Sequence, residues 1–193
     1  MSMTPNPRTI EMDKDKDGGA SPEAAGTGPL LVAVDDGYAR TKLWGEAPDG
    51  GAVRFAMRST VRPGRHGLTA LSGKGGFGSY VTEEGEKFTA SEDIEAESTE
   101  FDTFHVSTMN RVLVHHALAS AGYGGREVRL VCGLPVGDFY VDGERNEARI
   151  AAKTANLARG VANAASARPL ARIAGIEVGC QAVAAFIDHV TAD

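Results

Sequence analysis

Apolar and polar residues form distinct patterns along this chain, and these patterns predict where strands lie in its first third. Residues 30–34 are a continuous apolar run, which is typical of a strand buried on both faces. A tight turn at Asp35-Asp36-Gly37 ends that run. Residues 38–44 then predict a second strand, and apolar and polar residues alternate over residues 53–57, with a turn at residues 48–51 between the two segments. We therefore predict an antiparallel meander of three strands.

The middle of the chain predicts a small insertion followed by a helix. Residues 62–90 are rich in glycine and contain two short strand-like segments, around residues 80–81 and 87–89, so we expect a small subdomain or flap there. Acidic residues dominate 92–102, which predicts an exposed loop. Apolar residues recur at helical spacing from His105 to Ala121, and Gly122 supplies a C-terminal stop.

The last third of the chain predicts alternating strands and helices. We expect a buried strand at residues 128–132 and a largely exposed, alanine-rich helix at 144–161. A final strand at 170–173 and a helix at 179–190 follow. Antiparallel strands followed by βαβ crossovers give an α/β fold with a mixed sheet.

Composition narrows the class of protein. Residues 1–28 are polar and show no apolar periodicity, so we expect a disordered tail and a domain that spans residues 29–193. The net charge of −6 argues against direct binding of nucleic acid. No apolar run reaches the ~20 residues that cross a bilayer, and the N-terminus has no secretory signal. These features predict a cytoplasmic protein without a membrane partner.

The turn after the first strand carries the most specific chemistry. A buried strand delivers Asp35 to the edge of the sheet, and Gly37 permits a sharp reversal. The backbone N–H groups of such a turn form a concavity for anionic oxygens. Lys42 on the next strand is close enough to reach a phosphate, and Asp35 would hold Mg²⁺ through ordered water. Taken alone, this pattern is also typical of an ordinary hairpin turn.

Three stretches together resemble a known family: VDDGYARTKLW at 34–44, VLVHHALASAG at 112–122 and VRLVCGLPVGDFY at 128–140. In this order they are similar to the actin-like ATPase superfamily, and most similar to plasmid-segregation actins of the ParM/StbA type. A charged helix after the Leu-Pro loop is a weaker fourth likeness. The resemblance implies a ribonuclease-H-like, actin-like half domain.

The resemblance also implies roles for individual residues. Residues of the first phosphate loop would be Asp35, Asp36, Gly37 and Lys42, with loop amides from Tyr38, Ala39 and Arg40. Many members carry a small hydroxyl residue where this chain has Tyr38. Gln181 would orient the water that attacks ATP, with Glu177 as the alternative. The implied cofactor is ATP or GTP with Mg²⁺.

The family's second phosphate loop and adenosine pocket have no counterpart in these 193 residues. We therefore expect the N-terminal half of a filament-forming ATPase of plasmid DNA segregation, with no appreciable ATPase activity of its own. The implied partners are further copies of the protein and a DNA-bound adaptor. Two alternatives stay open: a stand-alone half-actin that caps or regulates filaments, and a fragment of another superfamily enzyme such as a sugar kinase.

His115 and His116 look like a pair of metal ligands. Adjacent helical residues point about 100° apart, so the two imidazoles would not share an ion. We therefore expect them to be core or boundary residues.

Overall fold

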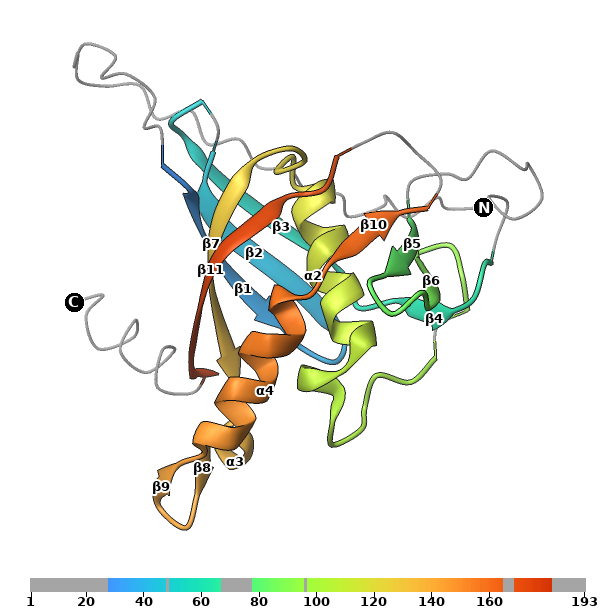
Figure 1. The fold of residues 1–193 in the computed structure, drawn as a ribbon. Helices are drawn as coiled ribbons and strands as arrows, with labels where there is room; N and C mark the ends of the chain where they lie inside the picture. The colour runs from blue at the N-terminus through green and yellow to red at the C-terminus, as the bar shows by residue number, and fades with distance from the viewer. Residues whose placement is uncertain (1–27, 48, 67–77, 96, 165–168, 182–193) are drawn as a thin grey trace, which may run out of the picture.

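A five-stranded mixed sheet forms the centre of the computed structural model, which describes residues 28–47, 49–66, 78–95, 97–164 and 169–181 (Figure 1). The order of strands is β11-β7-β1-β2-β3. The antiparallel part contains β1 (Leu30–Asp36), β2 (Arg40–Glu46) and β3 (Ala52–Arg58). The parallel part adds β7 (Glu127–Leu134) and β11 (Arg172–Cys180) beside β1. The predicted mixed sheet, with its meander of three strands, is confirmed.

Two helices cover one face of this sheet. Helix α2 (Thr108–Ser120) packs against β1 and β2, and helix α4 (Glu147–Ala158) packs against β11. Side chains that alternate along the strands, among them Val32, Val34 and Leu130, are buried under the helices. We call this covered side the inner face. The other side, the outer face, exposes Leu31, Trp44 and Val131.

Local sequence signals set the ends of both helices. Ser107 caps α2, because its Oγ accepts a hydrogen bond from the Asn110 amide at 3.2 Å. Gly122 adopts a φ of 93° just past the end of α2, a conformation that favours glycine. Asn146 caps α4 in the same way, through the Arg149 amide at 3.1 Å.

A second sheet lies beside α2, with the strand order β10-β5-β6-β4. Its strands are β4 (Val61–Pro63), β5 (Ser79–Thr82), β6 (Lys87–Ala90) and β10 (Val161–Asn163). The two short strands expected in the glycine-rich segment are therefore confirmed as β5 and β6. Arg111 on α2 fastens this sheet, because its buried guanidinium pairs with Glu84 at 2.6 and 3.1 Å.

The segment predicted as one exposed helix at 144–161 is different in the structure. A short helix α3 (Val136–Phe139) and a hairpin of β8 (Tyr140–Val141) and β9 (Glu144–Arg145) precede α4. The helix itself begins at Glu147, and it buries Lys153 and Leu157 completely or nearly so. Most of the helix is exposed or half-buried, as expected, but the burial of Lys153 was not, because the partner of Lys153 lies far away in the sequence.

The prediction for the end of the chain was also partly wrong. The last described strand, β11, runs to Cys180 and includes Gly179, both of which we expected to be helical. Gly175, Glu177 and Gly179 interrupt the apolar pattern, so the sequence did not show a long strand there. Gln181 is helical, whereas the tail 1–27, residues 67–77 of the flap and the helix expected at 182–190 lie outside the described residues.

The histidine pair lies in α2, as expected. His115 is 5% exposed, and the described residues contain no group of three or more potential metal ligands. No helix in the described ranges is long and apolar enough to cross a membrane.

Candidate functional site

The two aspartates at the end of β1 point to opposite faces of the sheet. Asp36 is 1% exposed on the inner face, whereas 51% of the Asp35 side chain is exposed on the outer face. This division follows from the alternation of side chains along a strand. The two carboxylates therefore have different partners, although the sequence analysis placed both at the phosphate loop.

Asp35 pairs with Lys42 on the outer face. The two residues are directly opposite each other in the β1–β2 ladder, and Lys42 Nζ lies 2.8 Å from Asp35 Oδ2. Such an exposed pair adds at most about 1 kcal/mol to stability. It holds the ammonium group at the base of the hairpin and leaves Asp35 Oδ1 without a hydrogen bond to any described residue.

Three consecutive carbonyl groups of the hairpin are held by hydrogen bonds. Ser59 donates from its Oγ to the Gly37 carbonyl at 2.7 Å and from its N–H to the Ala39 carbonyl at 3.0 Å. Thr99 Oγ1 donates to the Tyr38 carbonyl at 2.6 Å. In a planar trans peptide the C=O and the next N–H point in opposite directions. The three amide N–H groups that follow these carbonyls therefore point away from Ser59 and Thr99.

Within the described part of the chain, no acceptor receives the N–H groups of Gly37, Tyr38 or Ala39, and the Arg40 N–H has no acceptor outside the strand ladder. Successive unpaired amides in a turn form a concavity that suits an anion. Gly37 does not adopt a positive φ, so the sharp turn does not depend on that freedom. Its lack of a side chain matters instead, because a Cβ there would lie 3.1 Å from the Arg40 carbonyl.

The Tyr38 side chain turns away from this concavity. Its ring lies 5.3 Å from the Phe104 ring and 5.0 Å from His105, both in the short helix η1 (Phe104–Val106). Partial burial, with the nearby carboxylates of Asp138 and Asp102, raises the pKa of the Tyr38 hydroxyl. At this position the chain therefore offers its backbone to a ligand rather than a side-chain hydroxyl.

Gln181 lies at the same edge of the outer face. It follows Cys180, which pairs with Leu134 in the parallel β7–β11 ladder. A Cβ on Gly133 would overlap Gln181 Cγ and would lie 3.3 Å from its Cδ, so the glutamine side chain lies over that glycine. Gln181 Nε2 is buried and has no partner among the described residues. The sequence analysis missed Gly133, although a glycine inside a strand often marks such a close approach.

Glu177, the alternative to Gln181, lies farther from the edge. It is level with Val131 within the ladder and pairs with Arg129 across the outer face. The structure thus brings Gln181, but not Glu177, to the edge that carries the hairpin.

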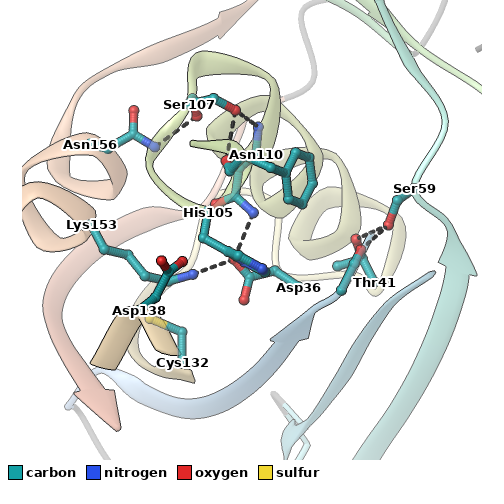
Figure 2. Close-up of polar contacts among 12 residues, drawn as sticks. Asp36, Thr41, Ser59, His105, Ser107, Asn110, Cys132, Asp138, Lys153 and Asn156 are labelled. Atoms are coloured by element: carbon teal, nitrogen blue, oxygen red, sulfur yellow. Dashed lines mark hydrogen bonds and ion pairs between the residues drawn. The ribbon is translucent and has the colours of Figure 1, made fainter. Parts of the chain in front are cut away.

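On the inner face, Asp36 is the centre of a buried polar cluster (Figure 2). Its Oδ2 accepts from Lys153 Nζ at 2.5 Å and from Asn110 Nδ2 at 2.7 Å, and it lies 4.0 Å from His105 Nδ1. Burial raises the pKa of the Asp36 carboxyl, but His105, Lys153 and Asn110 together outweigh burial and lower it. The buried carboxylate is therefore charged. Nothing in the sequence pattern linked these residues to the hairpin.

The sheet order and the hairpin at its edge define the class of the protein, which is an actin-like α/β fold. The solved structures that resemble it agree. The archaeal actin homologue Ta0583 superposes with a TM-score of 0.60 at 19% identity, covering 84% of this chain and 48% of that one. Its complex with ADP gives 0.58 at 18% identity, with coverages of 84% and 47%. The apo pSK41 ParM protein gives 0.53 at 13% identity, with coverages of 82% and 51%.

The family is shown by sequence. The model of the family "plasmid segregation protein ParM, N-terminal" matches residues 30–187, and the chain belongs to this family. No curated protein sequence matches the chain significantly. The chain spans about half the length of the solved structures it resembles.

Proposed function

We propose that this chain binds the phosphates of an adenine or guanine nucleotide at the hairpin, as part of an actin-like protein that forms filaments in plasmid segregation. One observation carries the proposal. At a single edge of the sheet, the hairpin with its unpaired amides follows β1, the Asp35–Lys42 pair lies at its base, and Gln181 lies over Gly133 of the neighbouring strand β7. Family membership supports the same assignment.

The hairpin supplies the groups that bind phosphate. The N–H groups of Tyr38, Ala39 and Arg40 would donate to phosphate oxygens, and Lys42 would add a positive charge. An oxygen ligand set suits Mg²⁺, which retains several of its waters in proteins. Asp35 fits that ion, because its carboxylate is exposed at the hairpin and Oδ1 is free to accept from a metal-bound water. The ion would neutralise phosphate charge.

Gln181 would act on the water that attacks the terminal phosphate. Its uncharged amide accepts a hydrogen bond from water without repelling the phosphate. The contact with Gly133 holds the side chain over the sheet edge, beside the strand that leads to the hairpin. Asp36, in contrast, is buried on the inner face, where Lys153 and Asn110 hold its Oδ2, so it has no direct contact with phosphate in this proposal.

The wider function rests on the family and on one solved relative. The pCBH ParM structure is described as a non-polymerisable quadruple mutant, and it superposes on this chain with a TM-score of 0.52 at 15% identity. Self-association into filaments and attachment to DNA through an adaptor protein are what we propose for the complete protein. A chain that carries one side of the nucleotide site should bind nucleotide weakly, with a Kd of about 1 mM, and should not turn it over.

The proposal is tested by titrating Mg-ADP into ¹⁵N-labelled protein and following amide resonances. We expect saturable shifts at residues 37–40. The variant Lys42→Met should weaken binding by about tenfold, since hydrogen bonds to charged groups contribute about 1.5–3 kcal/mol. The matched control is Lys87→Met, which removes an exposed lysine from β6 in the second sheet and should bind like the wild type.

Shifts that avoid the hairpin, or equal affinities for the wild type and Lys42→Met, would contradict the proposal.

A further inference from the structure

Helix α4 contacts the rest of the molecule through a row of polar side chains on one face. Three of the residues follow helical spacing, at i, i+4 and i+7, and the fourth, Arg159, directly follows the helix. The contacts are Arg149 with Asp138 at 3.2 Å, Lys153 with Asp36 at 2.5 Å, Asn156 with the Ser107 carbonyl at 2.8 Å, and Arg159 with Glu84 at 2.8 Å. These polar contacts accompany the apolar packing of Leu157, and only one of them reaches the strand that leads into the phosphate hairpin.

That contact is the most deeply buried of the row. Lys153 is 0% exposed and Asp36 is 1% exposed, and 117 residues separate them in the sequence. Removing two charges from water costs several kcal/mol for each ion, and their attraction often does no more than offset this cost. Apolar residues of similar volume often stabilise a fold as well as a buried ion pair does, or better. Stability alone is therefore a poor explanation for an ion pair at this position.

The place of Asp36 in the chain offers a better explanation. It is the last residue of β1, and Gly37 begins the hairpin directly after it. Lys153 from α4 and Asn110 from α2 both hold its Oδ2, so two helices hold one carboxylate (Figure 2). Ser59 and Thr99 hold the carbonyls that follow. Lys153 and Asn110 thus fix the residue before the turn, whereas Ser59 and Thr99 fix the carbonyl groups within it.

We propose that Lys153 is a positioning residue for the phosphate hairpin. Through Asp36 it fixes the end of β1, so that the amides of residues 38–40 converge on one anion before any ligand arrives. This inference rests on the proposed function of the hairpin, and it adds the residue that preorganises the site. Lys153 does not touch the nucleotide in this arrangement.

Two variants separate positioning from stability. Lys153→Met leaves the Asp36 carboxylate buried without its cation, so it should unfold at lower urea concentration than the wild type. The double variant Asp36→Asn/Lys153→Met removes both charges, and Asn110 still has an amide partner at position 36. We expect the double variant to regain most of the stability but not the geometry of the hairpin. The matched control is Arg159→Met, which removes an exposed ion pair at the far end of α4.

Two measurements on the folded, full-length chain give the answer. In the absence of ligand, backbone order parameters at residues 37–40 should fall from the rigid value of about 0.85 to below about 0.6 in the double variant and stay high in Arg159→Met. The affinity for Mg-pyrophosphate at these amides should fall about tenfold, as is usual when an outer-shell partner is removed.

A double variant that is folded, with a rigid hairpin and wild-type affinity, would overturn the inference. If wild-type amides at residues 37–40 do not respond to Mg-pyrophosphate, the proposed function of the hairpin fails. Even then, the order parameters at residues 37–40 of the double variant show whether Lys153 holds the hairpin in place.

Discussion

Two histidines on α2, one of them buried and the other half-buried, should make folding stability fall in mild acid. His115 has no hydrogen-bond partner among the described residues, and burial together with the nearby charge of Arg111 lowers its pKa to about 4. Burial also lowers the pKa of His116 to about 4, and the Tyr80 hydroxyl lies 2.8 Å from its Nδ1. Both imidazoles are therefore neutral in the folded protein at pH 7.

The size of the effect follows from proton linkage. A histidine in the unfolded chain has a pKa of about 6.5, so below that pH the unfolded state binds more protons than the folded state. The stability that the two neutral histidines allow is therefore present above pH 6.5, and it is lost as the pH falls from 6.5 toward 4. At pH 5 the linkage relation gives a loss of about 2 kcal/mol for each histidine, hence about 4 kcal/mol for the pair.

Carboxylates act in a separate range of pH. The pKa of Asp36 is lowered, and hydrogen bonds from Arg111 lead the effects that bring the pKa of Glu84 to about 2. Their contribution is present above the unfolded pKa of about 4 and is lost only below it. The interval between pH 6.5 and 5 therefore reports on the histidines.

Urea unfolding followed by circular dichroism at pH values from 7.5 to 5.0 measures this loss. The variant His115→Leu removes one imidazole and leaves no hydrogen-bonding partner unpaired, because neither ring nitrogen of His115 has one within the described ranges. About half of the pH dependence of the free energy of unfolding should therefore disappear. The control Val114→Ala changes a neighbouring core residue without a titratable group and should lower stability equally at every pH. Constant stability of the wild type between pH 7.5 and 5, or an unchanged pH dependence in His115→Leu, would refute the reasoning.

Three further predictions concern single contacts. Gly133→Ala should displace the Gln181 side chain, seen as a shift of its side-chain amide resonances, and cost about 1–3 kcal/mol of stability by overpacking; an unmoved Gln181 resonance would contradict the contact. Ser59→Ala should cost about 1 kcal/mol in urea unfolding, because Ser59 Oγ loses its hydrogen bond to the Gly37 carbonyl, and an unchanged free energy of unfolding would contradict that contact. Asn146→Ala should cost about 1 kcal/mol in urea unfolding through the lost cap of α4, and no change would exclude the cap.

The elements that follow local patterns were predicted correctly. The meander β1–β3, helix α2 and strand β7 have apolar periodicity and turn residues that agree with their structure. The hairpin β8–β9 and strand β10 lack such signals because they are two or three residues long. Strand β11 was predicted too short because its outer face is polar and glycine-rich.

The candidate site residues also fall into two groups: those that a local motif identifies and those that act on a segment distant in the sequence. Asp35, Gly37, Lys42 and Gln181 were identified from motifs, and the structure brings them to one edge of the sheet. The supporting residues Ser59, Thr99, Asn110, Gly133 and Lys153 were not identified, because each acts on a segment distant in the sequence. Adjacent Asp35 and Asp36 look equivalent in a motif, and only the pleat of β1 separates their roles.

A crystal structure of the chain with Mg-ADP tests the central claim most directly. The account predicts phosphate oxygens about 3 Å from the amides of Tyr38, Ala39 and Arg40, with Lys42 directed at the phosphates and Mg²⁺ reached by Asp35 through water. Phosphates bound elsewhere on the molecule, or a hairpin whose amides face away from the nucleotide, would contradict it.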